Sequence, residues 1–160
     1  YDAQVAAYAL YVGRKERARE VLSAVGRRRI ATQIEPDGRQ PHELARTRSW
    51  DYSCANLRNF CHLALLGERA GVDLWSFETD DGRSIRKALD FLVPFAIGEK
   101  RWKHKQLKQF RPQRLLAPLL LAWQRYADPR YRAALEKLPA STRDDLPRLL
   151  HAGPGPDERR

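Results

Sequence analysis

Apolar residues recur along most of this chain with the spacing of an α-helix. Three groups fall at positions i, i+3, i+4 and i+7, which places each group on one face of a helix. They are Ala18, Val21, Leu22 and Val25; Leu57, Phe60, Cys61 and Ala64; and Leu116, Leu119, Leu120 and Trp123. No alternating strand pattern persists in the 160 residues. We therefore predict an all-α fold built from antiparallel helix hairpins.

Turn-forming residues separate these helical segments. Residues 35–38 (Glu-Pro-Asp-Gly) and 79–82 (Thr-Asp-Asp-Gly) predict turns. Asp128-Pro129 predicts a helix start, with the aspartate as N-cap and the proline in the first turn. Pro94 is expected to end the helix that starts near Ser84, because proline has no backbone N–H to donate.

The domain organisation follows from where the helical pattern stops. We predict one domain over residues 1–150, in which Ser141 and Asp144 resemble a capping box before a last helix. Residues 151–160 contain Gly153-Pro154-Gly155-Pro156 and no apolar periodicity. They predict a disordered tail.

The charge of the chain is strongly positive and unevenly distributed. Lys and Arg number 30 against 20 Asp and Glu, a net charge of +10. Six basic residues lie between Arg101 and Arg114 with no acid among them, and a second cluster is Arg27–Arg29. Such patches attract nucleic acid, membrane surfaces or acidic polysaccharides. The apolar run from Leu115 to Trp123 is too short to span a bilayer, so no membrane partner is expected.

The cysteine and histidine residues give no sign of a metal site or a disulfide. Cys54 and Cys61 are seven residues apart, or about 10 Å along one helix, which is too far for a disulfide. Both are expected to pack as small apolar residues. His62 lies in an apolar helical segment and is expected to be a core histidine. Without His-x-x-x-His or Cys-x-x-Cys spacing, we expect no metal and no cofactor.

Residues 40–52 concentrate the side chains that could carry chemistry. Arg46 and Arg48 would point the same way in an extended segment, and Arg48 would share a helix face with Tyr52. Arginine binds carboxylates through two N–H groups, and Trp50 could stack on a sugar or a base. The alternative is structural: a tyrosine at a helix start is often a core residue, and a loop arginine is often solvated.

At these residues the sequence resembles the alginate lyase family. The resemblance is an ordered series of segments between Tyr1 and roughly Pro139. The segments are Ile34–Gly38, Gln40-Pro41, Glu43–Ser49, Tyr52-Ser53, Gly71–Trp75, Asp81–Asp90 and Asp128–Tyr131. The resemblance implies part of an incomplete α/α toroid with a substrate cleft across the helix ends. It also implies a polysaccharide lyase that cleaves alginate or a related polyuronate by β-elimination.

The resemblance assigns roles to individual residues. Tyr52 matches the catalytic tyrosine, and Arg46 matches the arginine that neutralises the substrate carboxylate, with Arg48 as the alternative. The expected substrate-binding residues are Arg48, Glu43, Trp50, Gln40, His104 and Trp102. The expected partner is an acidic polysaccharide rather than nucleic acid, and the expected location is the periplasm or outside the cell.

One family feature is missing from this sequence. The family carries an Asn-Asn-His motif that should lie immediately before the segment matched by Tyr1-Asp2. The chain also has no Met. We therefore expect a fragment whose N-terminus and secretion signal lie upstream, and which alone has little activity.

Two alternative functions fit the composition without the resemblance. One is a non-catalytic basic helical module that binds nucleic acid or another polyanion, although no helix-turn-helix or similar module is visible. The other is a helical-repeat interaction scaffold, although no fixed repeat period exists.

Overall fold

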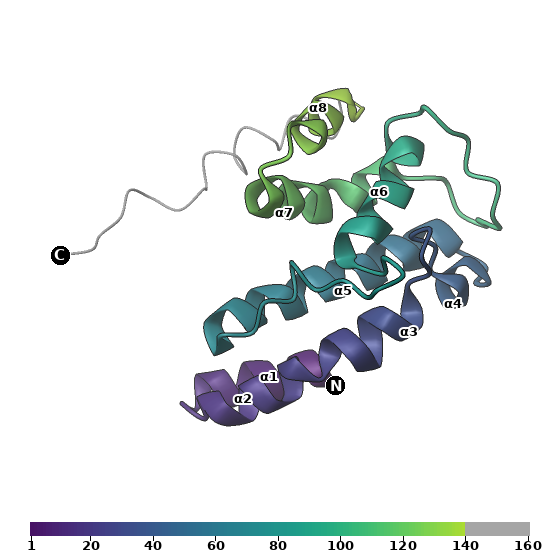
Figure 1. The fold of residues 1–160 in the computed structure, drawn as a ribbon. Helices are drawn as coiled ribbons and strands as arrows, with labels where there is room; N and C mark the ends of the chain where they lie inside the picture. The colour runs from purple at the N-terminus through teal and green to yellow at the C-terminus, as the bar shows by residue number, and fades with distance from the viewer. Residues whose placement is uncertain (140–160) are drawn as a thin grey trace.

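A computed structural model describes residues 1–139, which form eight α-helices, one π-helical turn and one 3₁₀ turn (Figure 1). The helices are α1 (Asp2–Tyr11), α2 (Lys15–Ser23), α3 (Ala31–Gln33), α4 (Pro41–Leu44), α5 (Ser49–Ala70), α6 (Ile85–Ala96), α7 (Leu116–Tyr126) and α8 (Pro129–Lys137). The turns are the π-helical η1 (Gly26–Ile30) and the 3₁₀ turn η2 (Pro112–Leu115). Within residues 1–139 the only β pairing is two isolated bridges, so the predicted all-α class is confirmed.

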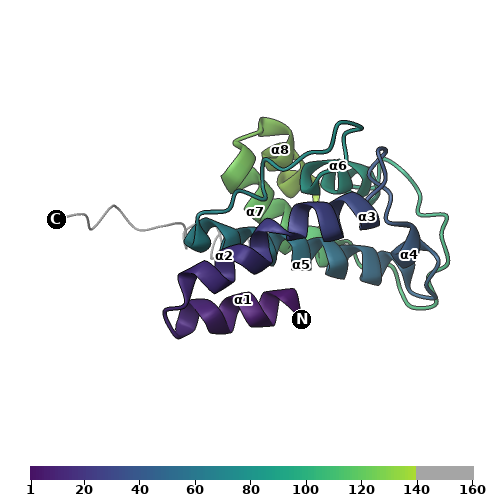
Figure 2. The ribbon, with the colours of Figure 1, turned by 60° about the horizontal axis from the view of Figure 1, so that its bottom comes forward.

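Helix α5 is the centre of the fold. The antiparallel hairpin of α1 and α2 packs on one side of it, and α6 and α7 pack on the other, with α8 against α7 (Figures 1 and 2). The core between them is apolar and almost fully enclosed. All six of these helices contribute side chains that are under 2% exposed, and they include Leu22, Leu57, Ile85, Leu89 and Leu119.

The ends of the helices follow local chemistry. Ser84 caps α6 by accepting a hydrogen bond from Lys87 N, and Asp128 caps α8 by accepting one from Arg130 N. Gly71 ends α5 in the left-handed conformation, with φ of 77°. The expectation that Pro94 ends α6 was wrong. The helix continues to Ala96, because a proline so close to the C-terminus removes only one hydrogen bond of the last turn.

The buried residues match the apolar spacing, with one error. All four members of the group Leu57, Phe60, Cys61 and Ala64 are buried on α5. His62, expected in the core, is instead exposed and lines a surface hollow beside Tyr8 of α1. It follows Cys61 by one residue, or about 100° around the helix, which turns it away from the core.

Both cysteines pack in the core as expected. Cys54 and Cys61 are free thiols, each about 1% exposed. Burial raises the pKa of Cys54 well above its usual range and that of Cys61 to about 12. The two thiols are therefore unreactive packing groups at neutral pH.

Two expectations are not decided by this architecture. The capping box at Ser141 and Asp144 and the tail 151–160 lie outside the described residues.

No helix formed by residues 1–139 combines the length and the apolar character needed to cross a membrane.

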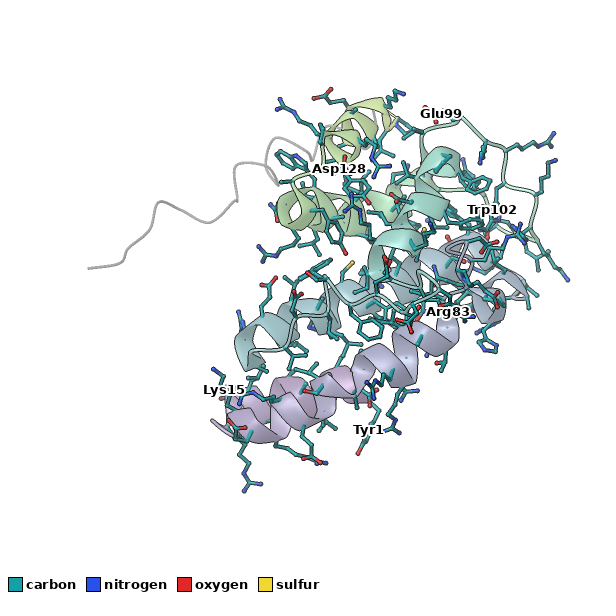
Figure 3. All side chains as sticks on the ribbon, viewed as in Figure 1. Tyr1, Lys15, Arg83, Glu99, Trp102 and Asp128 are labelled. Carbon is teal, nitrogen blue, oxygen red and sulfur yellow. The ribbon has the colours of Figure 1, made fainter. Side chains whose placement is uncertain are left out.

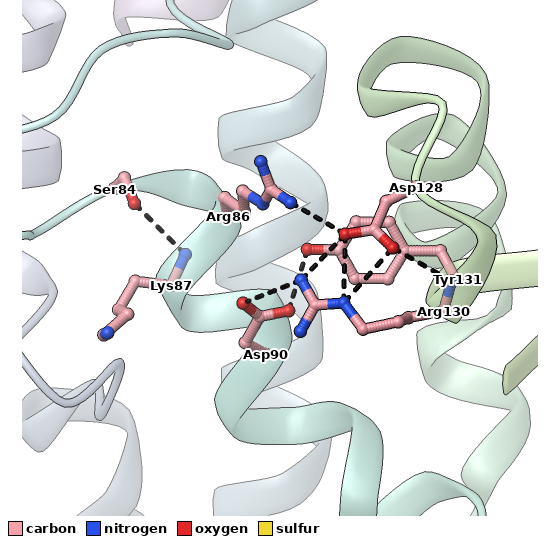
Figure 4. Close-up of polar contacts among 7 residues, drawn as sticks. All are labelled: Ser84, Arg86, Lys87, Asp90, Asp128, Arg130 and Tyr131. Carbon is pink, nitrogen blue, oxygen red and sulfur yellow. Dashed lines mark hydrogen bonds and ion pairs between the residues drawn. The ribbon is translucent and has the colours of Figure 1, made fainter.

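A polar network ties α6 to α8 (Figure 4). Arg86 of α6 donates to Asp128 at 2.7 Å, and Arg130 binds the same carboxylate at 2.7 Å. The hydroxyl of Tyr131 donates to Asp90 of α6 at 2.8 Å, while its ring is only 1% exposed. The two arginines hold the pKa of Asp128 near 2, so the network stays ionised at neutral pH. It fixes α8 against α6.

The predicted turn at 35–38 brings the chain directly against α6. Gly38 donates its N–H to Glu35 O at 2.9 Å and has φ of 87°, a region that favours glycine. A Cβ at this position would overlap Lys87 O and lie 2.8 Å from the Cβ of Phe91. This contact fixes the point from which the chain enters α4 and then α5.

We expect Gly38→Ala to destabilise the fold by both strain and overlap. The left-handed backbone should cost about 1–2 kcal/mol and the overlap about 1–3 kcal/mol more. Gly82→Ala is the matched control, because Gly82 has φ of 89° but a Cβ added there would meet nothing within 4 Å. Urea unfolding measures both variants. Equal losses would show that the close contact with α6 contributes nothing.

Candidate functional site

A basic loop, residues 97–111, folds back onto the start of α5. Leu107 N donates to Thr47 O at 2.9 Å, and Ser49 N donates to Lys105 O at 3.1 Å. The hydroxyl of Ser49 donates to the same carbonyl at 2.7 Å. These bonds join segments more than 50 residues apart in the sequence, so the loop has a defined path although it contains no helix.

Aromatic side chains hold the underside of the basic loop. Trp50 is fully buried, and its indole N–H donates to Arg111 O at 2.7 Å. Its ring centroid lies 5.2 Å from that of Trp102 and 4.4 Å from that of Phe110. Trp102 in turn donates its indole N–H to the Ser49 hydroxyl at 3.0 Å. The loop is therefore anchored by packing and by satisfied polar groups together.

Two arginines and a tyrosine meet at the N-terminal end of α5. The guanidinium of Arg46 lies 4.0 Å from the ring centroid of Tyr52, and that of Arg48 lies 5.9 Å from it. Arg48 stands at the N-cap of α5, and its carbonyl accepts from Tyr52 N at 3.0 Å. The structure thus brings together the three residues that the sequence singled out.

Asp51 lies beneath these cations, with a side chain that is only 10% exposed. Arg48 donates to its Oδ2 from both Nε and Nη2, each at 3.1 Å. Gln106 of the basic loop donates to the same oxygen at 3.4 Å, and Arg114 Nε lies 3.5 Å from Oδ1. Asp51 was not among the site residues predicted from the sequence. Its spacing of three from Arg48 was a usable sign of a helical ion pair, but nothing local indicated Gln106 or Arg114.

The basic loop borders two adjoining surface hollows, of about 550 Å³ and 420 Å³. Lys100, Arg101 and His104 line both, and Trp102 adds an aromatic edge to the larger one. Partial burial lowers the pKa of His104 from its ordinary value, and the charge of Arg39 lowers it further. Both effects favour the neutral imidazole, which can either accept or donate a hydrogen bond there.

The cations of the basic loop have no acidic partner among residues 1–139. They are Lys100, Arg101, Lys103, Lys105, Lys108 and Arg111. Elsewhere in this part of the chain many arginines are paired, as Arg86 is with Asp128. Uncompensated cations beside an aromatic hollow produce a positive potential that attracts polyanions.

Some residues expected to bind substrate lie below the surface. Trp50 is fully buried, and Gln40 is 1% exposed and donates to Ser53 O at 3.3 Å. Neither side chain can touch a ligand in this structure, so we assign both a supporting role instead of the expected contact. Glu43 is half-buried on α4. Within residues 1–139, no group of three or more His, Cys, Asp and Glu side chains could hold a metal ion.

Comparison with known proteins decides the family. The family model described as alginate lyase matches residues 1–102, more than half of the chain. The chain belongs to the alginate lyase family. The matched part includes Arg46, Arg48 and Tyr52, and it reaches Trp102 within the basic loop.

A solved structure supports the same assignment. The chain is similar to an alginate lyase from Bacteroides ovatus, with 34% sequence identity and a TM-score of 0.82. The match covers 91% of this chain and 40% of that lyase, so the chain spans about two fifths of the length of this relative. Among curated proteins, none matches. The fold over most of this alginate lyase family member therefore agrees with the part of an α/α toroid that the sequence implied.

We expect Trp50→Phe to loosen the basic loop. Phenylalanine keeps most of the ring packing but leaves Arg111 O without its donor, at a cost of about 1–3 kcal/mol. Amide hydrogen exchange in residues 98–111 should accelerate. Trp75→Phe is the control, because Trp75 is 7% exposed and donates its indole N–H to Glu68 at 2.8 Å, away from the loop. Faster loop exchange in both variants would contradict a specific anchoring role for Trp50.

Proposed function

We propose that this protein is a polysaccharide lyase that cleaves alginate or a related polyuronate by β-elimination. The observation that carries the proposal is the position of Arg46 and Arg48 around Tyr52 in a member of the alginate lyase family. Because the chain covers only 40% of the solved relative, we propose the activity for a full-length lyase that includes these residues. A periplasmic or extracellular location is part of the proposal, because acidic polysaccharides of this kind lie outside the cytoplasm.

β-Elimination needs three chemical functions that these residues can supply. The C5 proton of a uronate is a poor acid while its carboxylate is ionised, so cations must neutralise the charge that develops. Both Arg46 and Arg48 could neutralise this charge, because both guanidinium groups lie within 6 Å of the Tyr52 ring centroid. Arg46 is the main candidate, since its guanidinium is the closer of the two. The phenol of Tyr52 can protonate the leaving oxygen at C4, and as a phenolate it can accept the C5 proton.

The start of α1 lies near the same face of α5. Tyr1 and Asp2 line a hollow of about 480 Å³ together with Asn56 and Asn59, which follow Tyr52 by four and seven residues on that helix. In relatives that carry Asn-Asn-His just before the matching segment, the motif would approach Tyr52 from this side. The proposed site is therefore consistent with the position of the family motif that this sequence lacks.

We propose that the basic loop binds further sugar units. Trp102 offers an aromatic edge, and Lys100, Arg101 and His104 offer charge and hydrogen bonds to uronate carboxylates. The loop lies next to Tyr52, because Arg48 and Gln106 form a backbone bridge. A polymer that reacts at Tyr52 could therefore continue into the hollows that border the loop.

The runner-up function is a non-catalytic module that binds nucleic acid or another polyanion. The unpaired cations of the basic loop favour it, because they would attract any polyanion. The two proposals differ in product. A lyase forms a 4,5-unsaturated uronate that absorbs in the ultraviolet, whereas a binding module leaves the polymer intact.

We expect Tyr52→Phe in the natural full-length protein to lower kcat by about 10²–10⁴-fold, because the general acid-base group is lost. Tyr126→Phe is the control. Tyr126 donates its hydroxyl to Trp75 O at 3.0 Å, so its loss should cost about 0.5–1.5 kcal/mol of stability and leave kcat unchanged. Ultraviolet product formation and thermal unfolding measure both variants. Near-normal kcat in Tyr52→Phe would sink the proposed role.

We expect the double variant Lys103→Gln, Lys108→Gln to bind an oligouronate roughly two- to thirtyfold more weakly at low salt. Each lost pair of exposed opposite charges should cost about 0.2–1 kcal/mol of binding free energy. The difference should shrink in 1 M salt. Arg14→Gln with Lys15→Gln removes the same charge at the α1–α2 corner, and Lys15 lies far from Trp102 (Figure 3). Calorimetric titration across a salt series measures both. Equal losses would show that only net charge matters.

A further inference from the structure

We propose that Asp51 is a positioning residue that holds Arg48 beside Tyr52 and ties the basic loop to the same end of α5. The inference deepens the proposed function and rests on it for the roles of Arg48 and Tyr52. Asp51 does not face the solvent or the substrate side, since its side chain is 10% exposed. It acts through the residues that it binds.

The geometry of the ion pair leaves Arg48 free to bind a ligand. Both contacts to Asp51 use one edge of the guanidinium, Nε and Nη2, and both end on the single oxygen Oδ2 at 3.1 Å. Arginine has five N–H donors, so Nη1 and the second hydrogen of Nη2 stay available. The side chain of Arg48 is 34% exposed, which gives these donors access to solvent. Asp51 thus fixes the orientation of Arg48 and leaves enough N–H donors free to bind a second carboxylate.

Asp51 also supplies the negative charge that this cluster needs. Within residues 1–139 it is the acid that pairs with Arg48 and with Arg114. Arg46 and Arg48 approach the same ring, so without a nearby carboxylate their like charges would favour separation. Replacing the charge should therefore let Arg48 leave the ring of Tyr52.

The arrangement is poorly suited to stability alone. Oδ1 of Asp51 is buried without a hydrogen bond that meets ordinary geometry, and Arg114 Nε stands 3.5 Å from it. An under-satisfied buried carboxylate usually costs free energy. Asp128 is the contrasting case, because its carboxylate receives several short bonds from Arg130 and one from Arg86. The carboxylate of Asp51 therefore has fewer good hydrogen bonds than that of Asp128, which fits a residue that positions Arg48.

The same carboxylate couples the arginine to the loop. Gln106 donates to Oδ2 of Asp51 at 3.4 Å and accepts from Trp50 N at 3.1 Å. Gln106 therefore connects Asp51 with the backbone of the first turn of α5. A change at Asp51 should be felt both at Tyr52 and at the loop that would hold neighbouring sugars.

The test compares Asp51→Asn with Asp128→Asn in the natural full-length protein. Both carboxylates are about nine-tenths buried and each pairs with two arginines, but Asp128 lies in the α6–α8 network. We expect Asp51→Asn to lower kcat on alginate or polyglucuronate by about 10- to 100-fold, as for a displaced catalytic group. Asp128→Asn should keep kcat within about twofold. Equal kcat in the two variants would overturn the proposal.

A double-mutant cycle separates positioning from a general loss of structure. If Asp51 acts through Arg48, then Asp51→Asn should have little further effect on kcat in an Arg48→Gln background. If Asp51→Asn only damaged the structure, its fold-loss of kcat would multiply with that of Arg48→Gln. Full multiplicativity would therefore refute the proposed route through Arg48.

An activity-independent measurement distinguishes this inference from the proposed function. In ¹⁵N-labelled protein the Nε–H signal of Arg48 should be protected from solvent exchange, and Asp51→Asn but not Asp128→Asn should remove the protection. An unchanged Arg48 signal in Asp51→Asn would overturn the role of Asp51 whatever the activity. The two proposals can also fail separately. If the wild-type protein forms no unsaturated uronate, but Asp51→Asn removes the protection of the Arg48 Nε–H, the lyase function is refuted and the positioning of Arg48 by Asp51 is established.

Discussion

The burial of Trp50 at the first turn of α5 is the interaction on which the candidate site depends. The indole is fully enclosed and donates to Arg111 O at 2.7 Å, which joins the C-terminal end of the basic loop to α5. Removing about 150–250 Å² of aromatic surface from water, at about 25 cal/mol per Å², stabilises this contact by at most about 4–6 kcal/mol. Two exposed like charges 8 Å apart in water repel by only about 0.5 kcal/mol. The burial of Trp50 therefore outweighs the repulsion of any one such pair of cations on the basic loop.

This balance explains why the loop can be ordered and still available to a ligand. Its backbone is fixed from below by Ser49, Trp50 and Trp102, whose polar groups are all satisfied. Its charged side chains need no intramolecular acid to keep the loop in place. Their positive potential therefore remains directed to the solvent, where a polyanion can respond to it.

The sequence predicted the helices well because their signals are local. Periodic apolar positions, the Asp128 cap and the glycine turn at residue 38 each depend on a few neighbouring residues. Exposure of single positions was harder, as His62 and Gln40 show, because one residue of rotation or one distant partner decides it. The convergence of Arg46, Arg48 and Tyr52 was visible from spacing. The contributions of Gln106 and Arg114 come from segments more than 50 residues away and required the fold.

The electrostatics of the start of α5 combine these local and distant contributions. The N-terminal end of a helix carries a partial positive charge, which adds to that of Arg46 and Arg48 around Tyr52. An acid in the first turn is favourable in such a place, and Asp51 occupies it. The carboxylate is buried, however, and it meets the cations from inside the protein. It can therefore offset their mutual repulsion in the free protein while leaving their outer surface positive for an incoming carboxylate.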